Sequence, residues 1–295
     1  MTHVRRATVI GASSVLLWST LAILVLFTEN HIPPFQLLSM TFFIAFALMW
    51  VKWRIEGHSG LHHFKQPVLA WLLGVGGLFG YHLALFIAFA HAPAVEANLI
   101  NYLWPLLIVL FAAFLPGEHF RWQHVVGALL ALAGCWMLLG GKATGFDSQY
   151  ILGYGAAVVA ALTWSSYSVL SRLVKSVPTD AVGWFCAVTA VLAGIFHLML
   201  EQTQWPANSL QWIGVIGLGL GPVGLAFFTW DHGIKHGNIQ LLGVLAFGAP
   251  LLSTIILVAM NKAPFSITLL LACVAITLGA FIASRSQSRP VQVAD

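Results

Sequence analysis

The sequence consists almost entirely of apolar runs of roughly 20 residues, separated by short breaks that carry proline, glycine or charged residues. An α-helix of about 20 apolar residues crosses the hydrocarbon core of a bilayer. We count ten such runs. Their predicted limits are 7–27, 33–53, 68–90, 95–115, 122–140, 150–172, 179–200, 209–231, 238–260 and 264–284. The sequence therefore predicts an all-α integral membrane protein with ten transmembrane helices.

The composition agrees with this fold class. Charged side chains make up 7% of the chain and apolar ones 59%, against about 25% and 45–50% in a typical soluble domain. So few charges cannot cover a water-exposed surface, which excludes soluble enzymes, nucleic-acid-binding proteins and secreted factors. We expect a small-molecule substrate and membrane lipid as partners, with no nucleic acid and no obligate protein partner. The first run exceeds the roughly 7–15 residues of a signal-peptide core, so we expect it to remain as the first helix.

Lysine and arginine residues are concentrated in alternate breaks between the runs. If the N-terminus lies in the cytoplasm, all but Lys142 and Lys262 fall on the cytoplasmic side. Short cytoplasmic loops carry an excess of these residues, so the pattern predicts that both termini are cytoplasmic. The residues on that side are Arg5, Arg6, Lys52, Arg54, Lys65, Arg121, Arg172, Lys175, Lys235, Arg285 and Arg289.

The two halves of the chain resemble each other at a shift of 145–146 residues. Trp18-Ser19-Thr20 corresponds to Trp164-Ser165-Ser166, and Pro105-Leu106-Leu107 to Pro250-Leu251-Leu252. The shift predicts two repeats, residues 1–145 with helices one to five and residues 146–295 with helices six to ten. Because five is odd, the halves would be inverted, with a binding site near the midplane and alternating access. The alternative is an ancestral duplication that serves only packing.

Polar side chains in the third and fourth runs are candidates for a substrate pathway. Tyr81 lies on a face of small residues with His82 beside it, and Asn98, Asn101 and Tyr102 lie close together in the next run. Such groups are costly in a spanning helix unless they have partners or water. A packing seam at Tyr81 and a hydrogen-bonded core histidine at His82 are the alternatives.

Aromatic residues near the centres of two runs are the second set of candidates. Trp18 and Trp164 occupy corresponding positions in the two halves, and Tyr167 follows Trp164 by about one turn. Aromatic walls with a few hydrogen-bonding groups suit a bulky apolar side chain attached to a small polar head. Filling of the bundle core is the alternative. Tryptophans at the ends of runs, such as Trp50 and Trp53, are expected in the interfacial belts.

Proline and glycine mark four candidate hinge or kink positions. Pro105 and Pro250 cannot donate to the carbonyl four residues earlier. A carbonyl released near the midplane could accept a hydrogen bond from an ammonium group, although an ordinary kink is the commoner use. Gly217 and Gly221 fit either a hinge or a close helix crossing.

The centres of the runs contain no Asp, Glu, Lys or Arg. Glu96 and Asp231 lie near helix ends, where we expect water to reach them. Buried ionisable groups mark proton relays, so their absence favours transport down the substrate gradient over coupling to protons. His82 and Glu96 are the remaining titrating candidates for coupling.

No residue pattern predicts a metal site, a cofactor or an active site. His58, His62 and His63 follow the second run with only Glu56 nearby, which favours a solvated loop. The three cysteines are isolated in apolar runs, so neither a disulfide nor a metal site is expected. An enzyme would need a positioned nucleophile and base, paired acids or a metal cluster within the spans, and we find none in the sequence.

The pattern resembles the EamA-type branch of the drug/metabolite transporter superfamily. The matching residues are Trp18-Ser19-Thr20, Pro105, and the stretch Gly117-Glu118-His119-Phe120 followed by Gly127 and Ala133-Gly134. Within that superfamily the chain looks closest to the YddG-like bacterial aromatic amino-acid exporters. The resemblance implies a central cavity lined by helices one, three, four, six, eight and nine. Eight candidate substrate-binding residues fall on those inner faces: Trp18, Tyr81, His82, Asn98, Asn101, Tyr102, Trp164 and Tyr167.

These observations lead to a main hypothesis and an alternative. The main hypothesis is a secondary transporter of the inner membrane that exports aromatic and other neutral amino acids by alternating access through an aromatic and polar cavity. The alternative keeps the fold but changes the substrate to cationic drugs or other small metabolites, which Trp18 and Trp164 could hold over their ring faces.

Overall fold

The computed structural model describes residues 3–29, 31–116, 121–140 and 145–285, and all regular structure in these residues is helical. Ten helical segments among them are long and apolar enough to cross a membrane. This confirms the prediction of an all-α chain with ten spans, and the observed limits differ from the predicted ones by a few residues. The 117–120 stretch used for the resemblance, and Lys142 and Arg289 used for the orientation, lie outside the described residues.

Several spans are built from two helices. The first five consist of α1 (His3–Ser19) with α2 (Leu21–Phe27), α3 (Pro34–Ile55), α4 (Val68–Val75) with α5 (Tyr81–His91), α6 (Ala94–Asn101) with α7 (Trp104–Ala112), and α8 (Trp122–Gly140). The second five consist of α9 (Ile151–Leu170), α10 (Ala181–Leu200), α11 (Ser209–Leu220) with α12 (Ala226–His236), α13 (Ile239–Ala246) with α14 (Gly248–Ala259), and α15 (Ile267–Ser284). Short 3-10 helices η1 (Leu61–Phe64), η3 (Ser148–Tyr150) and η4 (Ser171–Val174) lie beside them.

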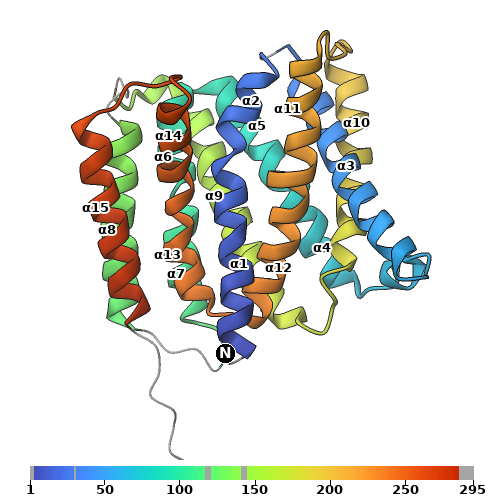
Figure 1. The fold of residues 1–295 in the computed structure, drawn as a ribbon, viewed down its shortest axis with the longest axis horizontal. Coiled ribbons are helices and arrows are strands. Elements are labelled where there is room, and N and C mark those ends of the chain that lie inside the picture. Colours follow the sequence, from blue (N-terminus) through green and yellow to red (C-terminus); the bar gives the residue numbers. More distant parts are fainter. Residues whose placement is uncertain (1–2, 30, 117–120, 141–144, 286–295) are drawn as a thin grey trace, which may run out of the picture.

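Helices from the two halves of the chain pack against each other (Figure 1). α8 lies along α15 at one edge of the bundle, α3 lies along α10, and α1 lies along α12. Glycines allow two of these crossings to be very close. A Cβ on Gly127 would lie 2.5 Å from the Gly279 carbonyl oxygen, and a Cβ on Gly11 would lie 2.8 Å from the Gly233 Cα. Small residues at helix crossings permit such approach in membrane proteins.

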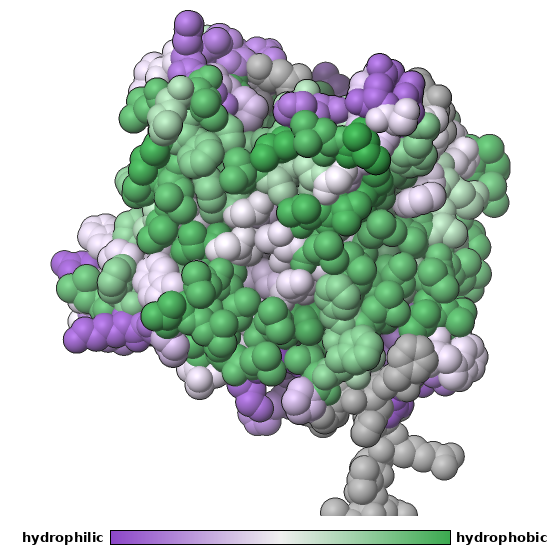
Figure 2. Space-filling view, turned by 180° about the vertical axis from the view of Figure 1, so that it is seen from behind, coloured by the Kyte–Doolittle hydropathy of each residue, from purple (hydrophilic) through white to green (hydrophobic). Residues whose placement is uncertain are grey.

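On the face of the bundle seen in Figure 2, hydrophobic residues predominate across the middle and hydrophilic residues gather at the two ends. Large apolar side chains such as Phe114 and Leu198 are 88% and 78% exposed, as expected for residues that face lipid. Trp50 is exposed and fits an interfacial position. The same expectation was wrong for Trp53, which is fully buried and stacked on Trp184 at 5.7 Å between ring centroids.

Interruptions occur at corresponding places in the third and eighth spans and in the fourth and ninth. A π-helical turn joins α4 to α5 at Gly76–Gly80, and another joins α11 to α12 at Gly221–Leu225. α6 ends at Asn101 before Pro105, and α13 ends at Ala246 before Pro250. Asn101 and Ala246 each lie four residues before a proline. Because proline has no N–H, it cannot donate the helical hydrogen bond to their carbonyls. Single π-helical turns are frequent at functional sites.

Two acidic residues near helix ends are buried, contrary to the sequence expectation. Asp231 and Glu96 are each 1% exposed. Asp231 forms an ion pair with Lys235 at 2.9 Å and accepts a hydrogen bond from the Thr179 hydroxyl at 2.7 Å. Lys235 also donates to the Val177 carbonyl at 3.1 Å. The segment before α10 therefore covers this end of α12, which the position of Asp231 in its run did not reveal.

Candidate functional site

Four tryptophans from four spans form a ring cluster inside the bundle. Trp18 of α1 lies 6.0 Å from Trp104 of α7 and 6.0 Å from Trp164 of α9, measured between ring centroids. Trp230 of α12 completes the cluster at 5.1 Å from Trp18. Trp104, Trp164 and Trp230 are buried, whereas Trp18 keeps some accessible surface. We call these four residues the tryptophan cluster.

Sequence reasoning missed Trp230. It lies at the end of the predicted eighth run, where a tryptophan is normally interfacial. The run continues to His236 in the structure, so Trp230 lies inside the span. Phe227 one turn earlier was the available signal, because Phe227 and Trp230 share a helix face and both rings contact Trp18.

Two indole N–H groups of the cluster have partners on other helices and two do not. Trp18 Nε1 donates to the Pro222 carbonyl at 3.0 Å, inside the π-helical turn. Trp230 Nε1 donates to the Ser168 hydroxyl at 3.1 Å. Within the described residues, the indole N–H groups of Trp104 and Trp164 donate to no protein atom. An unpaired N–H inside a helix bundle is available to a substrate or to water.

Tyr81 and Asn101 form a polar pair next to the tryptophan cluster. The Asn101 side-chain amide donates to the Tyr81 hydroxyl at 3.2 Å, and the Tyr81 ring lies 5.5 Å from Trp164. Asn101 Oδ1 is buried and has no partner among the described residues. A buried amide oxygen without a donor is costly, so this atom is an acceptor that a substrate ammonium group or a water molecule can satisfy.

The remaining predicted residues surround this pair. His82 Nδ1 contacts the Leu78 carbonyl at 2.7 Å, and its ring lies edge-on to Phe42. Asn98 and Tyr102 are half-buried, and neither side chain has a hydrogen-bond partner among the described residues. Tyr167 is buried against Gly77, and it lines a groove of about 390 Å³ between α4 and α9. Trp18, Tyr81, His82 and Trp164 are thus in ring contact with one another or with a shared neighbour. Tyr167 contacts the Trp164 ring at 5.3 Å and also lines the outer groove.

The predicted kink residues lie at or near the interruptions. Pro105 and Pro250 lie one and two residues after the starts of α7 and α14. Gly217 faces Leu24 so closely that a Cβ would lie 2.7 Å from it, whereas a Cβ on Gly221 would meet nothing. Gly217 therefore serves a close crossing, and Gly221 starts the π-helical turn that places the Pro222 carbonyl on Trp18.

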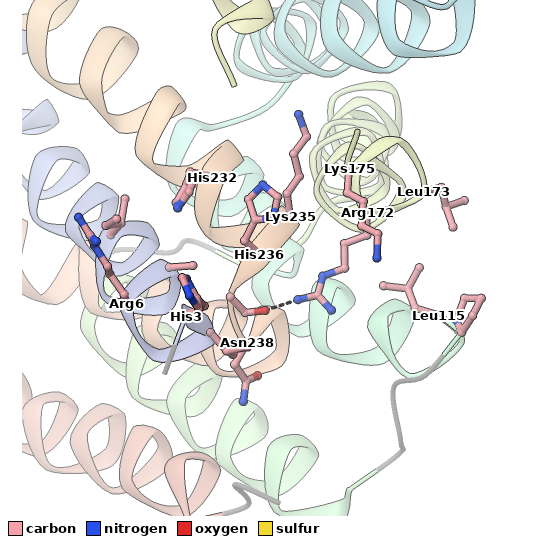
Figure 3. Close-up of a pocket in the computed structure, with 15 residues that line it drawn as sticks. His3, Arg6, Leu115, Arg172, Leu173, Lys175, His232, Lys235, His236 and Asn238 are labelled. Atoms are coloured by element: carbon pink, nitrogen blue, oxygen red, sulfur yellow. Dashed lines mark hydrogen bonds between the residues drawn. The ribbon is translucent and has the colours of Figure 1, made fainter. Parts of the chain in front are cut away.

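A large cavity opens at the end of the bundle where the N-terminus lies (Figure 3). Its volume is about 1040 Å³. Its described lining residues include four cationic side chains, three histidines and no acid. The four are Arg6, Arg172, Lys175 and Lys235. Arg172 reaches across it and donates to the backbone carbonyls of Ile234, at 2.6 Å, and Gly237. We call this cavity the basic vestibule.

The basic vestibule and the polar residues of the fourth span lie on opposite sides of the tryptophan cluster. Along α1 the vestibule residue Ile10 precedes Trp18, and along α12 the vestibule residue His232 follows Trp230. Along the fourth span, Asn98 and Trp104 come before the vestibule residue Leu115. None of the eight predicted residues lines the vestibule. Along these three spans, the rings of the cluster therefore lie between the vestibule and Asn98.

Comparisons with known proteins agree with the fold. The model of the EamA-like transporter family matches this chain twice, over residues 6–140 and 151–285. The aromatic amino acid exporter YddG of Ancylobacter novellus is 49% identical over 280 residues, which cover 94% of this chain and 96% of that protein. YddG of Escherichia coli K12 is 27% identical over 89% of this chain and 91% of its own length. A crystal structure of a protein 48% identical to this chain matches it with a TM-score of 0.90, covering 95% of this chain and 98% of that one.

Proposed function

The chain belongs to the EamA-like transporter family, and we propose that it exports aromatic and other neutral amino acids from the bacterial cytoplasm across the inner membrane. The observation that carries the proposal is the tryptophan cluster with unpaired polar atoms beside it. Two relatives that match most of the chain are named aromatic amino acid exporters. The tryptophan cluster and the relatives point to the same substrate class. The aromatic rings of the cluster suit an aromatic side chain, and the polar atoms beside it suit the zwitterionic head of an amino acid.

The polar atoms divide into acceptors and donors that match an amino acid. Asn101 Oδ1 is an unpaired acceptor for the ammonium group. The N–H groups of Trp104 and Trp164 are donors for the carboxylate. We assign the side chain of the substrate to the ring faces of Trp18 and Tyr81. Because these contacts are dipolar and uncharged, we expect weak binding, about millimolar.

The basic vestibule favours an amino acid over a cationic drug. Arg6 and Lys175 line it, and its described lining residues contain no acid. A cavity lined by one sign of charge concentrates ligands of the opposite sign and repels those of the same sign. A zwitterion can enter with its carboxylate towards the cations, whereas a dication is repelled at the mouth. This charge pattern supports the first hypothesis over the alternative of cationic drugs.

We infer that transport proceeds by alternating access between two inverted halves, residues 1–145 and 146–295. The double match of the family model and the corresponding interruptions at Gly76–Gly80 and Gly221–Leu225 support this division. In the mechanism, the helices rock about these turns and about the breaks before Pro105 and Pro250. The tryptophan cluster opens towards the vestibule in one state and closes it in the other. Both termini lie in the cytoplasm, as the distribution of lysine and arginine supports.

Export is driven by the substrate gradient in this proposal. The buried acid Asp231 is neutralised by Lys235 at 2.9 Å, and an acid held in an ion pair is a poor proton carrier. We expect flux to change little when a pH gradient is imposed on vesicles at constant substrate gradient. Steep acceleration by the pH gradient would contradict this and would make His82 or Glu96 the coupling group.

The test is flux of labelled phenylalanine in proteoliposomes that contain the purified protein. We expect protein-dependent flux that unlabelled tryptophan inhibits, with weaker inhibition by phenethylamine, which lacks the carboxylate. Trp164→Ala should reduce flux at least tenfold without unfolding the protein. Trp212→Ala, at a lipid-exposed position on α11, is the matched control and should leave flux unchanged. Absence of flux for every neutral amino acid, or inhibition by an aromatic dication but not by tryptophan, would overturn the proposal.

A further inference from the structure

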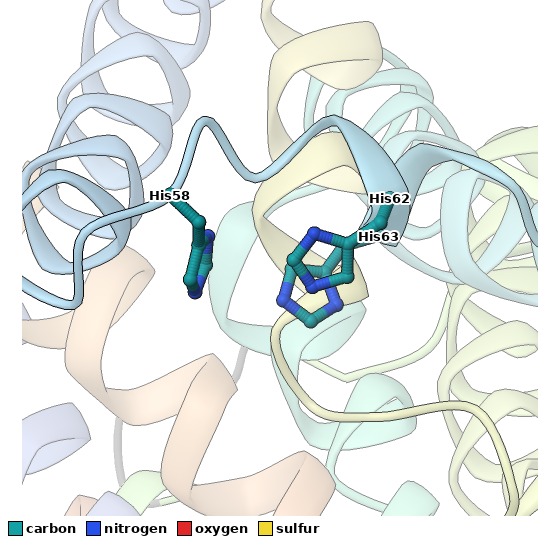
Figure 4. Close-up of side chains that lie close together, drawn as sticks. All are labelled: His58, His62 and His63. Atoms are coloured by element: carbon teal, nitrogen blue, oxygen red, sulfur yellow. The ribbon is translucent and has the colours of Figure 1, made fainter.

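Three histidines in the loop between α3 and α4 gather their rings in one place (Figure 4). His58 comes from the loop itself, and His62 and His63 come from the 3-10 helix η1. One ring nitrogen of each lies within 4.8 Å of the corresponding nitrogens of the other two. The rings of His62 and His63 are 3.8 Å apart between centroids, and those of His58 and His62 are 4.8 Å apart. We call these residues the histidine triad.

Two of the three rings have a carboxylate at Nε2. The Nε2 of His58 faces Glu56 at 3.3 Å, and the Nε2 of His63 faces Asp180 at 3.5 Å. A carboxylate at one ring nitrogen holds the proton there and leaves the lone pair of the other nitrogen for a ligand. At His58 that other nitrogen, Nδ1, accepts a hydrogen bond from the Gly60 amide at 3.1 Å, so a metal ion bound there would replace the amide as its partner. The carboxylates beside His58 and His63 correspond to the carboxylates that commonly accept the second ring N–H of metal-binding histidines.

The scaffold around the triad is fixed by contacts between the loop and α10. The Gly60 carbonyl accepts from Trp184 Nε1 at 3.0 Å, and Gly60 has a φ of 73°, which favours glycine. Asp180 is held by Lys52 at 2.5 Å and by Trp53 Nε1 at 3.1 Å. The loop therefore has one defined path, with the triad on it and a positioned carboxylate behind it.

His63 is the most enclosed of the three rings, with its side chain 13% exposed. Partial burial, together with the nearby imidazole of His62, lowers the pKa of His63 below its usual value near 6.5.

From this geometry we propose that the histidine triad binds one divalent transition-metal ion, with Zn²⁺ as the expected ion. Zinc binds imidazole nitrogens at about 2.0–2.1 Å, which places tetrahedral ligands about 3.4 Å apart. The triad must contract by only about 1.5 Å to reach that geometry, and the exposed ring of His62 can move. Three imidazoles and an open fourth position for water complete the site. The proposal does not depend on the transported substrate.

The test uses tag-free, metal-stripped full-length protein in detergent, titrated with Zn²⁺ by calorimetry. We expect one ion per chain with a dissociation constant of 10 µM or lower. Mg²⁺ should not compete, because it prefers oxygen ligands. Replacing His58, His62 and His63 together by alanine should weaken binding at least a hundredfold. His91→Ala, at an exposed histidine on α5, should leave it unchanged.

A second variant tests the role of the Asp180 carboxylate, and melting temperatures control for misfolding. Asp180→Asn keeps all three imidazoles, and it should weaken Zn²⁺ binding about ten- to a hundredfold. Zn²⁺ should also raise the melting temperature of the parent protein, and this shift should vanish in the triple variant. The melting temperature without metal reports whether each variant is folded. No saturable binding below 100 µM in the folded parent, or unchanged affinity in the folded triple variant, would overturn the proposal.

Discussion

Polar side chains inside the bundle differ in whether a neighbouring helix supplies their hydrogen-bond partner. Trp18 and Trp230 donate across helices to Pro222 and Ser168. Asn101 Oδ1 and Thr189 Oγ1 are buried and have no partner among the described residues. The residue types alone could not distinguish these cases, because pairing depends on which helix lies opposite. The unpaired atoms are where a ligand can act.

At Asn101 we predict an effect on substrate affinity. Asn101→Ala removes the unpaired acceptor that we assign to the ammonium group, and a hydrogen bond to a charged group contributes about 1.5–3 kcal/mol. The KM for phenylalanine should rise by about tenfold or more, as measured by the concentration dependence of flux. Thr189→Val, at another buried group without a partner among the described residues, should leave KM unchanged. Equal effects of the two variants would contradict a substrate contact at Asn101.

At Lys235 we predict an effect on stability. The side chains of Lys235 and Asp231 are 3% and 2% exposed, so Lys235→Met leaves a buried carboxylate without its partner. Breaking one side of a buried pair costs about 3–5 kcal/mol. The melting temperature should fall clearly, whereas Lys262→Met, at an exposed lysine, should change it little. A melting temperature equal to that of the parent would mean that the pair contributes no net stability.

Among the elements, the π-helical turn at Gly76–Gly80 depends on one of its glycines. A Cβ on Gly77 would lie 2.4 Å from Tyr167 Cγ, whereas a Cβ on the adjacent Gly76 would meet nothing within 4 Å. The turn therefore brings the backbone of the third span against the Tyr167 ring of α9. Sequence inspection identified the glycine-rich face, but it could not tell which glycine touches a partner.

This difference gives a matched pair of variants in one turn. Gly77→Ala should displace Tyr167 and destabilise the protein by about 1–3 kcal/mol through overpacking, and it should reduce phenylalanine flux. Gly76→Ala should be neutral or slightly stabilising, since alanine favours a helix by up to about 1 kcal/mol over glycine. Melting temperature and flux measured together check both. Similar behaviour of the two variants would contradict the close contact at Gly77.

The element boundaries show which local rules determined the helices. The breaks before Pro105 and Pro250 follow from proline itself, which cannot pair with the carbonyl four residues earlier. The extension of the eighth span from the predicted 231 to His236 follows from neither composition nor hydropathy. That last turn carries Lys235, whose charge a hydropathy pattern excludes from a span. In the structure Asp231 neutralises this charge and the Val177 carbonyl accepts a further hydrogen bond from it.

In the whole molecule, the tryptophan cluster lies between the basic vestibule and the polar residues on its other side. Its four rings come from the first, fourth, sixth and eighth spans. In the proposed mechanism these rings form the barrier between access from the two ends of the bundle. A transporter that works by alternating access requires such a barrier to be movable.

This division predicts the sidedness of cysteine labelling. In a background with Cys273→Ser, and with Cys135 and Cys186 protected by burial, a cysteine at Ile10 should react with an impermeant thiol reagent only from the vestibule side. A cysteine at Asn98 should react only from the opposite side. Right-side-out and inside-out vesicles distinguish the two. Reaction of both positions from the same side would contradict the barrier.

The sequence by itself determined the ten spans and the interior position of Trp18 and Trp164. Hydropathy, proline positions and positions within runs are local properties, and the bilayer forces every apolar run of sufficient length to become a helix. Only the tertiary structure decided which side chains meet. It brought Trp230 into the cluster, buried Asp231 with Lys235, and placed His58 beside His62 and His63. These outcomes depend on the packing of helices that are distant in the chain and on the path of one loop. They are therefore not encoded in the periodicity of any single segment.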